Sequence, residues 1–143
     1  MGKKKITTAE DTTTTEAKAA PVPSVSKKKV DTGLLYVEST YNNTKLILTD
    51  AKGNVLATSS SGALGFKGAK KGTPFAAAKV GEIIGGKAAV MGMKDAGVLI
   101  KGVGSGRESG VRGFLSKGVN ITSIKDITPV PHNGPKAKKP RRV

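Results

Sequence analysis

The side chains best suited to chemistry in this chain are cationic, and they sit on glycine-rich segments. Between Gly65 and Lys71, the lysines Lys67, Lys70 and Lys71 surround a single ring, Phe66, on a flexible glycine backbone. Lysines in such a loop can neutralise phosphates, and an exposed ring can stack on an unpaired base. The segment therefore favours contact with RNA, while an ordinary solvated loop is the alternative.

A second glycine-rich stretch, Gly102–Gly106, leads into a helix that we expect to begin near Arg107. Glycines let phosphate approach backbone amides, and the N-terminus of a helix offers N–H groups and the positive end of its dipole. Arg107 and Arg112 add guanidinium groups that can bind phosphate through two parallel hydrogen bonds. The stretch does not complete a dinucleotide fingerprint, because Arg107 occupies its last glycine position. A plain strand-to-helix turn remains the alternative.

The C-terminal segment 129–143 carries five basic residues and no acidic one. Its run from Lys136 to Arg142 can bind a polyanion, although such runs also serve as localisation signals. His132 has no identifiable acid or nucleophile partner, so we expect it to pack or to contact a backbone. Asn133 precedes Gly134, which lacks a hindering side chain, so backbone attack on the asparagine amide can produce isoaspartate.

The sequence offers few residues that could form a catalytic or metal-binding site. The chain has no cysteine and one histidine, which excludes a thiol nucleophile and a cysteine-ligated metal. A magnesium-dependent nuclease would need several clustered carboxylates and stays as a rival, with Asp50 as its test residue. The segment Gly81–Ala88 follows phosphate-loop spacing up to Lys87, but an alanine replaces the magnesium-binding hydroxyl. We expect no catalytic residue, cofactor, metal or small-molecule substrate.

The charge of the whole chain indicates a polyanionic partner. The 143 residues carry a formal charge of +15, with every region cationic: +3 over 1–31, +7 over 32–128 and +5 over 129–143. Nucleic acid is the usual partner for such an excess, and a general nucleic-acid-compacting protein is one alternative. No apolar run approaches the ~20 residues of a membrane span, and the N-terminus lacks an apolar signal core, so we expect a cytoplasmic protein.

Composition divides the chain into three parts. Residues 1–31 are low in complexity and in large apolar side chains, so we expect a disordered basic extension. Residues 32–128 should form one globular α/β domain, and 129–143 an extended basic tail that orders on RNA.

The pattern within the domain predicts the order βββαβαβ with a mixed sheet. We expect strands over 34–40, 45–49, 55–60, 97–101 and 121–128, with the first hairpin turning at Asn42-Asn43 through left-handed backbone. A first helix should begin at Thr73-Pro74 and bury Ala76, Val80, Ile83 or Ile84, and Met91. Its three glycines, Gly81, Gly85 and Gly86, are tolerable if it lies close against a sheet.

The second helix should bury Val111, Phe114 and Leu115. The spacing of Ser105 and Glu108 predicts a capping box at its start, and Gly118 should end it.

A series of motifs, in order across about 33–143, resembles the universal family of small-subunit ribosomal protein eleven, of bacterial type. The motifs are Tyr41-Asn42-Asn43-Thr44, Thr49-Asp50, Gly53-Asn54, Gly65-Phe66-Lys67-Gly68, Thr73-Pro74-Phe75-Ala76-Ala77, Lys101-Gly102, Gly106-Arg107-Glu108-Ser109, Asp126 to Gly134 and Arg141-Arg142-Val143. Each motif is weak alone, and together they are highly specific.

The resemblance implies a non-catalytic component of the small-subunit platform, with a ribonuclease-H-like three-layer fold. It implies binding to 16S-type ribosomal RNA near the path of the messenger RNA, beside ribosomal proteins seven, eighteen and twenty-one. The N-terminal segment contains Glu10, Asp11 and Glu16 and is a poor organellar transit peptide, so we expect a cytoplasmic rather than an organellar ribosome. The residues expected to contact RNA are Asn42, Asn43, Thr44, Phe66, Lys67, Gly68, Lys70, Lys71, Thr73, Gly102, Gly104, Gly106, Arg107, Ser109, Arg112, His132, Asn133, Gly134, Lys136, Lys138, Lys139, Arg141 and Arg142.

Overall fold

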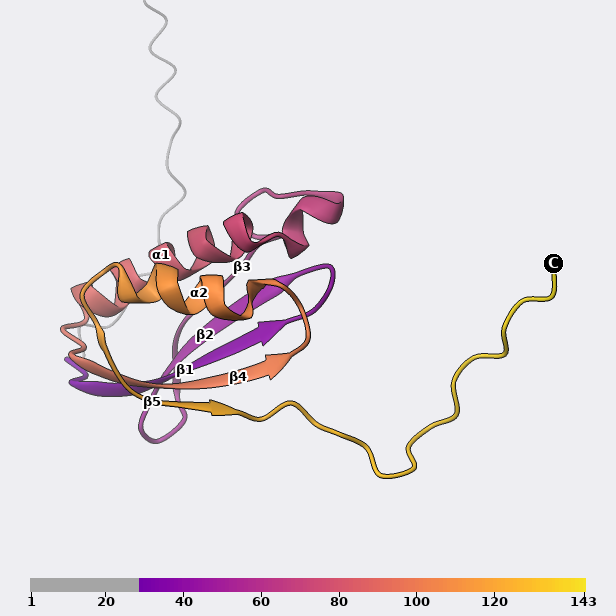
Figure 1. Cartoon of the computed structure of the whole chain (residues 1–143). Coiled ribbons are helices and arrows are strands. Elements are labelled where there is room, and N and C mark those ends of the chain that lie inside the picture. Colours follow the sequence, from indigo (N-terminus) through magenta and orange to yellow (C-terminus); the bar gives the residue numbers. More distant parts are fainter. Residues whose placement is uncertain (1–28) are drawn as a thin grey trace, which may run out of the picture.

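A computed structural model describes residues 29–143 (Figure 1). The prediction of a disordered extension therefore falls almost wholly outside the described residues. The elements follow the predicted order: β1 (Thr32–Ser39), β2 (Thr44–Asp50), β3 (Val55–Ser60), a 3-10 helix η1 (Gly68–Gly72), α1 (Pro74–Val90), β4 (Asp95–Gly102), α2 (Gly106–Leu115) and β5 (Asn120–Asp126). Neither α-helix in this part of the chain is long and apolar enough to cross a membrane.

The five strands form one mixed sheet in the order β3-β2-β1-β4-β5. The first three pair antiparallel as a meander, whereas β4 and β5 continue the sheet in parallel from β1. The predicted α/β class and element order are therefore confirmed. The parallel strands are reached through α1 and α2, because a parallel connection needs a crossover.

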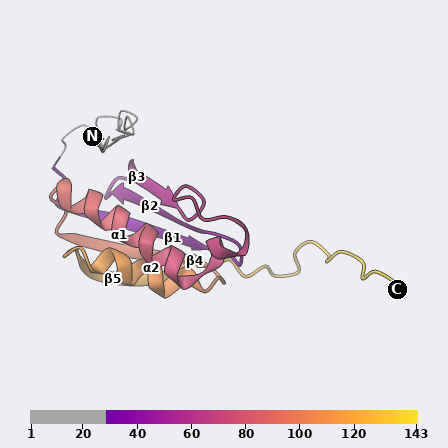
Figure 2. The same cartoon turned by 90° about the horizontal axis from the view of Figure 1, so that it is seen from above.

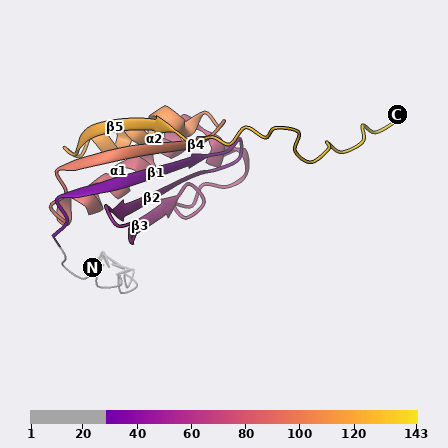
Figure 3. The same ribbon diagram turned by 90° about the horizontal axis from the view of Figure 1, so that it is seen from below.

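Both helices cover the same face of the sheet, as the views from above and below show (Figures 2 and 3). Two crossovers that advance in the same direction across a sheet lie on one side when both are right-handed. Residues 29–143 thus form two layers, where the resemblance implied three, and the second sheet face has no helix over it.

The core lies between the sheet and the two helices. Alternate residues of the central strands point into it, and Phe114 of α2 is its largest fully buried side chain. Val30 packs against this core and donates its N–H to the Met91 carbonyl oxygen at 3.3 Å. The folded unit therefore already includes Val30, which the sequence analysis placed in the extension.

The start of α1 is as predicted. The Thr73 hydroxyl accepts the Ala76 N–H at 3.4 Å, and Pro74 occupies the first helical position. Along the predicted apolar stripe Ala76, Val80, Ile84 and Met91 are buried, while Ile83 is exposed.

The start of α2 differs from the capping-box prediction, which was wrong. Ser105 has helical backbone angles and caps no amide; its hydroxyl instead donates to the Gly72 carbonyl oxygen at 2.7 Å. The side chain of Glu108 pairs with Arg112 one turn further along. Tertiary contact with the neighbouring loop thus takes the hydroxyl that local spacing assigned to the cap. Gly118 has φ +87° just after the helix, in keeping with its predicted role at the end.

Two of the three glycines of α1 face the second helix rather than the sheet. A Cβ at Gly81 would lie 2.2 Å from the Gly110 carbonyl oxygen, and one at Gly85 would lie 2.9 Å from that of Phe114. Gly86 faces open space. Two of the three glycines therefore allow the helices to approach closely, which corrects the expectation of a glycine-mediated contact with the sheet.

The hairpin between β1 and β2 also differs from expectation. Asn42 and Asn43 do not adopt left-handed backbone, since Asn133 is the one non-glycine with positive φ among residues 29–143. Thr40 closes this turn instead: its N–H donates to the Asn43 carbonyl oxygen at 2.8 Å, and its hydroxyl accepts the Asn43 N–H at 3.1 Å.

Candidate nucleic-acid interface

The glycine-rich and basic segments meet at one end of the sheet. Strands β1, β3 and β4 end there, α1 and α2 begin there, and the chain leaves the sheet there after β5 (Figures 1 and 2). We call this the loop end and define it as residues 40–43, 61–73 and 102–105. The fold thus brings together segments that lie about 60 residues apart in sequence.

Glycines lock the three loops against one another. A Cβ at Gly72 would lie 2.1 Å from the Tyr41 carbonyl oxygen, and one at Gly104 would lie 2.2 Å from that of Thr40. The hydrogen bond from Ser105 to the Gly72 carbonyl adds a third connection. Since no larger residue fits at these positions, the loop end has a defined shape before any partner binds.

The basic loop, residues 65–72, presents its charge to solvent. Lys67, Gly68 and Lys70 are exposed, and Lys71 is partly exposed. The Thr73 hydroxyl donates to the Lys70 carbonyl oxygen at 2.7 Å while it caps α1, so this predicted contact residue holds the loop to the helix.

Two exposed aromatic rings, one in the loop end and one beside it, were not among the predicted contact residues. Tyr41 is 78% exposed and Phe75 is 64% exposed. Phe66, the ring that the sequence singled out, is partly buried and packs edge-to-face with Phe75 at a centroid distance of 6.2 Å. The available signal was position: Tyr41 lies in the turn between β1 and β2, and Phe75 lies outside the predicted apolar stripe of α1.

The Gly102–Gly106 turn uses its glycines for packing. The Gly104 N–H donates to the Ser39 carbonyl oxygen at 3.0 Å, and the Gly102 N–H to the Thr128 hydroxyl at 3.1 Å. Gly106 is buried, and its missing side chain leaves room for the Thr44 hydroxyl. Two amides predicted to face phosphate are therefore already paired within the protein.

Arg107 joins three segments. Its guanidinium donates to the Gly102 carbonyl oxygen at 2.6 Å and forms an ion pair with the carboxylate of Asp126. Hydrogen bonds from the hydroxyl and N–H of Thr128, together with Arg107, lower the pKa of Asp126 from 3.8 to about 2. Arg107 thus braces the turn against the end of β5, a role that the sequence did not indicate.

The other predicted contact residues on α2 and β2 vary in exposure. Arg112 is exposed and pairs with Glu108, and Ser109 is partly exposed. Thr44 is fully buried with its hydroxyl 3.5 Å from that of Ser39, so its side chain packs within the protein rather than facing a partner. Asn42 is exposed, and the buried side-chain oxygen of Asn43 has no hydrogen-bond partner within residues 29–143.

The C-terminal tail leaves the sheet after Thr128 and runs away from the body of the protein (Figure 1). All of its residues from Pro129 to Val143 are exposed, and they form no helix or strand. The predicted contact residues there are His132, Asn133, Gly134, Lys136, Lys138, Lys139, Arg141 and Arg142. The tail starts beside the loop end, so its charge extends the same cationic surface.

Among residues 29–143, the acidic side chains do not gather into a metal-binding cluster. Within residues 29–143, no three of the His, Asp and Glu side chains are grouped so that they could hold a metal ion. Asp50 closes its own turn by accepting the N–H groups of Lys52 and Asn54, each at 2.9 Å. Hydrogen bonds from Asn54 are the main reason why the pKa of Asp50 is lowered.

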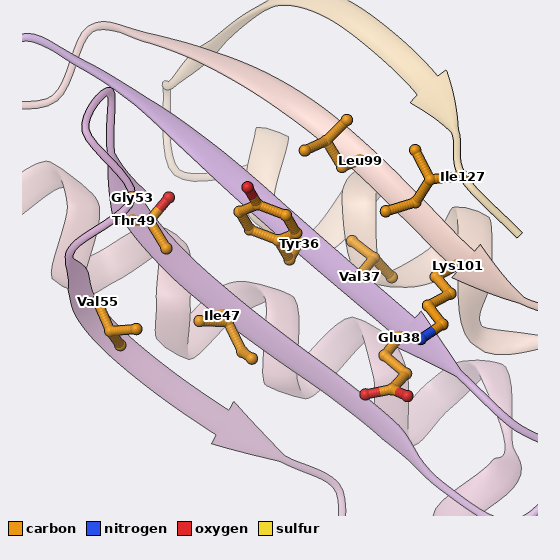
Figure 4. Close-up of a pocket in the computed structure, with 10 residues that line it drawn as sticks. All are labelled: Tyr36, Val37, Glu38, Ile47, Thr49, Gly53, Val55, Leu99, Lys101 and Ile127. Carbon is orange, nitrogen blue, oxygen red and sulfur yellow. The ribbon is translucent and has the colours of Figure 1, made fainter.

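The sheet face without helices holds a shallow groove of about 390 Å³. Its lining is mainly apolar, with Tyr36, Ile47, Leu99 and Ile127 across the middle (Figure 4). Glu38 and Lys101 lie opposite each other on neighbouring strands at one end of the groove. The groove lining carries one acidic and one basic side chain, whereas the loop end carries three lysines, Lys67, Lys70 and Lys71, and no acidic residue.

A comparison with protein-family models decides which family this arrangement represents. The model of the family Ribosomal protein S11 matches residues 33–142, which is nearly all of the described chain. The chain belongs to the ribosomal protein S11 family. It is therefore a non-enzymatic structural protein of the small ribosomal subunit, where it binds ribosomal RNA and has other ribosomal proteins as partners. The matched segment includes the three loops of the loop end and all but the last residue of the tail.

Proposed function

We propose that this S11-family protein binds 16S-type ribosomal RNA in the small-subunit platform of cytoplasmic ribosomes, with the loop end and the tail as its RNA-binding surface. One observation carries the proposal. The basic loop, the glycine-rich turn and the start of the tail, which are separate in sequence, lie at the same end of the fold (Figure 2).

The two parts of this surface act differently. The loops are fixed by close glycine contacts and by Arg107, so they present Lys67 and Lys70 in a preformed arrangement. A preformed surface loses little conformational entropy on binding. The tail makes no secondary structure, so it orders when it binds, and the release of counterions from the RNA offsets that entropy.

The proposal extends to the neighbours of the protein. The apolar groove on the open sheet face suits a protein surface better than a phosphate backbone, because apolar side chains offer no compensation for phosphate desolvation. We propose that the protein's neighbours in the platform are ribosomal proteins seven, eighteen and twenty-one. We also propose that the protein lies close to the path of the messenger RNA, upstream of the decoding site.

A salt titration tests the RNA-binding mechanism. If the surface neutralises about 6–10 phosphates, affinity for small-subunit ribosomal RNA should fall roughly 10³–10⁵-fold between 50 and 200 mM salt. A nearly flat response would overturn the mechanism. Equal affinity for duplex DNA and for the ribosomal RNA would favour the general compaction protein instead.

A sedimentation experiment tests the location. The full chain should co-sediment with small subunits in high-salt gradients, and footprinting of the RNA should protect nucleotides of the platform. Protection elsewhere in the subunit, with binding intact, would contradict the platform assignment alone.

A further inference from the structure

We propose that Tyr41 and Phe75 are stacking surfaces for unpaired bases of the bound RNA. The inference rests on the proposed function, since it assigns a subsite within the same RNA-binding surface. It adds two residues that were not among the predicted contacts and gives Phe66 a supporting role.

The distribution of aromatic residues is the first argument. The chain has two tyrosines, three phenylalanines and no tryptophan. Phe114 is buried in the core, and Tyr36 is partly buried on the open sheet face. Of the five rings, the two that are exposed both lie at or beside the loop end, Tyr41 at 78% and Phe75 at 64%.

The support behind each ring is the second argument. The backbone of Tyr41 is held where its carbonyl meets Gly72, so the exposed ring projects from a fixed turn. Phe75 lies in the first turn of α1, against the partly buried ring of Phe66 at an interplanar angle of 83°. Rings held in this way lose little freedom when a base stacks on them, which is what a stacking platform requires.

The charge around the rings selects the partner. Lys79 places its ammonium 5.6 Å from the centroid of Phe75, and Lys67, Lys70 and Lys71 lie on the adjoining loop. There is no acidic residue from position 61 to position 81, nor in the 40–43 turn. A surface of exposed rings among lysines matches RNA, which presents phosphates beside the flat faces of unpaired bases.

Alanine substitutions in the full chain provide the test. Base–ring stacking is worth about 5- to 150-fold in affinity per ring removed. Tyr41→Ala and Phe75→Ala should each weaken binding to small-subunit ribosomal RNA, and to a single strand of adenosines, by a factor in that range. Neither should weaken binding to an RNA duplex with the same number of phosphates, because paired bases are not available for stacking.

Three controls separate stacking from other effects. Tyr41→Phe keeps the ring and should keep the affinity. Val90→Ala shortens a side chain that is 90% exposed at the far end of α1 and should change nothing. The slope of log K against log salt should be the same for Tyr41→Ala and the wild type, since no phosphate contact is lost.

A spectroscopic signal gives an independent measurement. In a Tyr36→Phe background Tyr41 is the sole tyrosine, and its emission should be quenched by the adenosine strand but not by the duplex. Unchanged affinity and unquenched emission would overturn the proposal. So would normal RNA affinity with failed incorporation into small subunits, which would assign the rings to a protein neighbour. If the wild-type protein shows no salt-dependent binding to small-subunit ribosomal RNA, the proposed RNA-binding function itself is wrong.

Discussion

Arg107 at the start of α2 and Asp126 at the end of β5 form an ion pair that fixes the point where the C-terminal tail leaves the fold. Arg107 also donates to the Gly102 carbonyl oxygen, and Asp126 accepts from the hydroxyl and the N–H of Thr128. These two residues therefore connect the glycine-rich turn of the loop end with the first residues of the tail. In an RNA-binding protein this arrangement lets a rigid surface and an extended segment approach the same RNA.

The contribution of Asp126 to the stability of the fold should depend on pH in the acidic range. The folded-state pKa of Asp126 is about 2, below the ordinary 3.8, so ionised Asp126 stabilises the fold above about pH 3.8. This stabilisation is lost as pH falls from about 3.8 through about 2. In urea unfolding series the wild type should lose stability over that window, and Asp126→Asn should lose less. Parallel curves for the two proteins would show that the ionised Asp126 carboxylate, with its hydrogen bonds from Thr128 and Arg107, contributes nothing.

For two glycines of α1 we predict opposite effects of the same substitution, because only one of them lies against α2. Gly81→Ala should destabilise the protein by roughly 1–3 kcal/mol, because its Cβ would lie 2.2 Å from a backbone oxygen of α2. Gly86→Ala on the same helix meets nothing within 4 Å and should stabilise by about 1 kcal/mol through helix propensity. Denaturant unfolding of both variants checks this. Equal effects would contradict the close helix contact.

Gly72 offers a test of the loop-end geometry. Gly72→Ala places a Cβ 2.1 Å from the Tyr41 carbonyl oxygen and should displace the 40–43 turn. RNA affinity should fall several-fold although no contact group is removed. Gly62→Ala is the matched control, because its Cβ meets only the flexible Lys71 side chain at 3.6 Å. If both variants bind RNA equally well, the geometry of the 40–43 turn does not depend on a glycine at position 72.

The tail should account for a defined part of the salt dependence. Deleting residues 136–143 removes five basic side chains. The slope of log K against log salt should fall by roughly 0.7–0.9 for each phosphate that the tail neutralises. Thermal unfolding should change little, because these residues are exposed. An unchanged slope would remove the tail from the RNA interface.

Asn133 should form isoaspartate as the protein ages. It is exposed, has φ +63° and precedes Gly134, so the backbone nitrogen of Gly134 can attack the side-chain amide carbon. This attack expels ammonia and forms a succinimide, which water then opens to isoaspartate. Peptide mapping of aged protein should find the modified residue at 133. Asn54, which is also exposed but precedes Val55, should stay unmodified. Finding only unmodified asparagine at both positions would count against this reactivity.

Local sequence rules predicted the elements well and the contacts between them poorly. The Thr73 cap and Pro74 determine the start of α1 within a few residues, so spacing alone revealed it. Ser105 had equally good spacing for a cap, but its hydroxyl bonds to Gly72, 33 residues earlier in the chain. A long-range partner of this kind leaves no trace in local spacing.

The glycines illustrate the same limit. Their number suggested flexible loops that could admit phosphate, yet Gly72, Gly104 and Gly106 are positions where another part of the chain comes too close for a side chain. Similarly, the lysines around Phe66 suggested that its ring is free to stack on a base. In the fold the Phe66 ring is partly buried against Phe75, and the ring of Phe75 is exposed. The sequence indicated the chemistry of the site, and only the packing showed which groups face outward.

The central claim is that RNA is bound by the loop end and the tail. Ultraviolet crosslinking of the protein within assembled small subunits, followed by peptide identification, tests it most directly. Crosslinked peptides should come from residues 40–43, 61–75, 102–107 and 129–143. Crosslinks confined to the open sheet face around Tyr36, or to the opposite end of the fold near Lys94 and Lys117, would contradict the account.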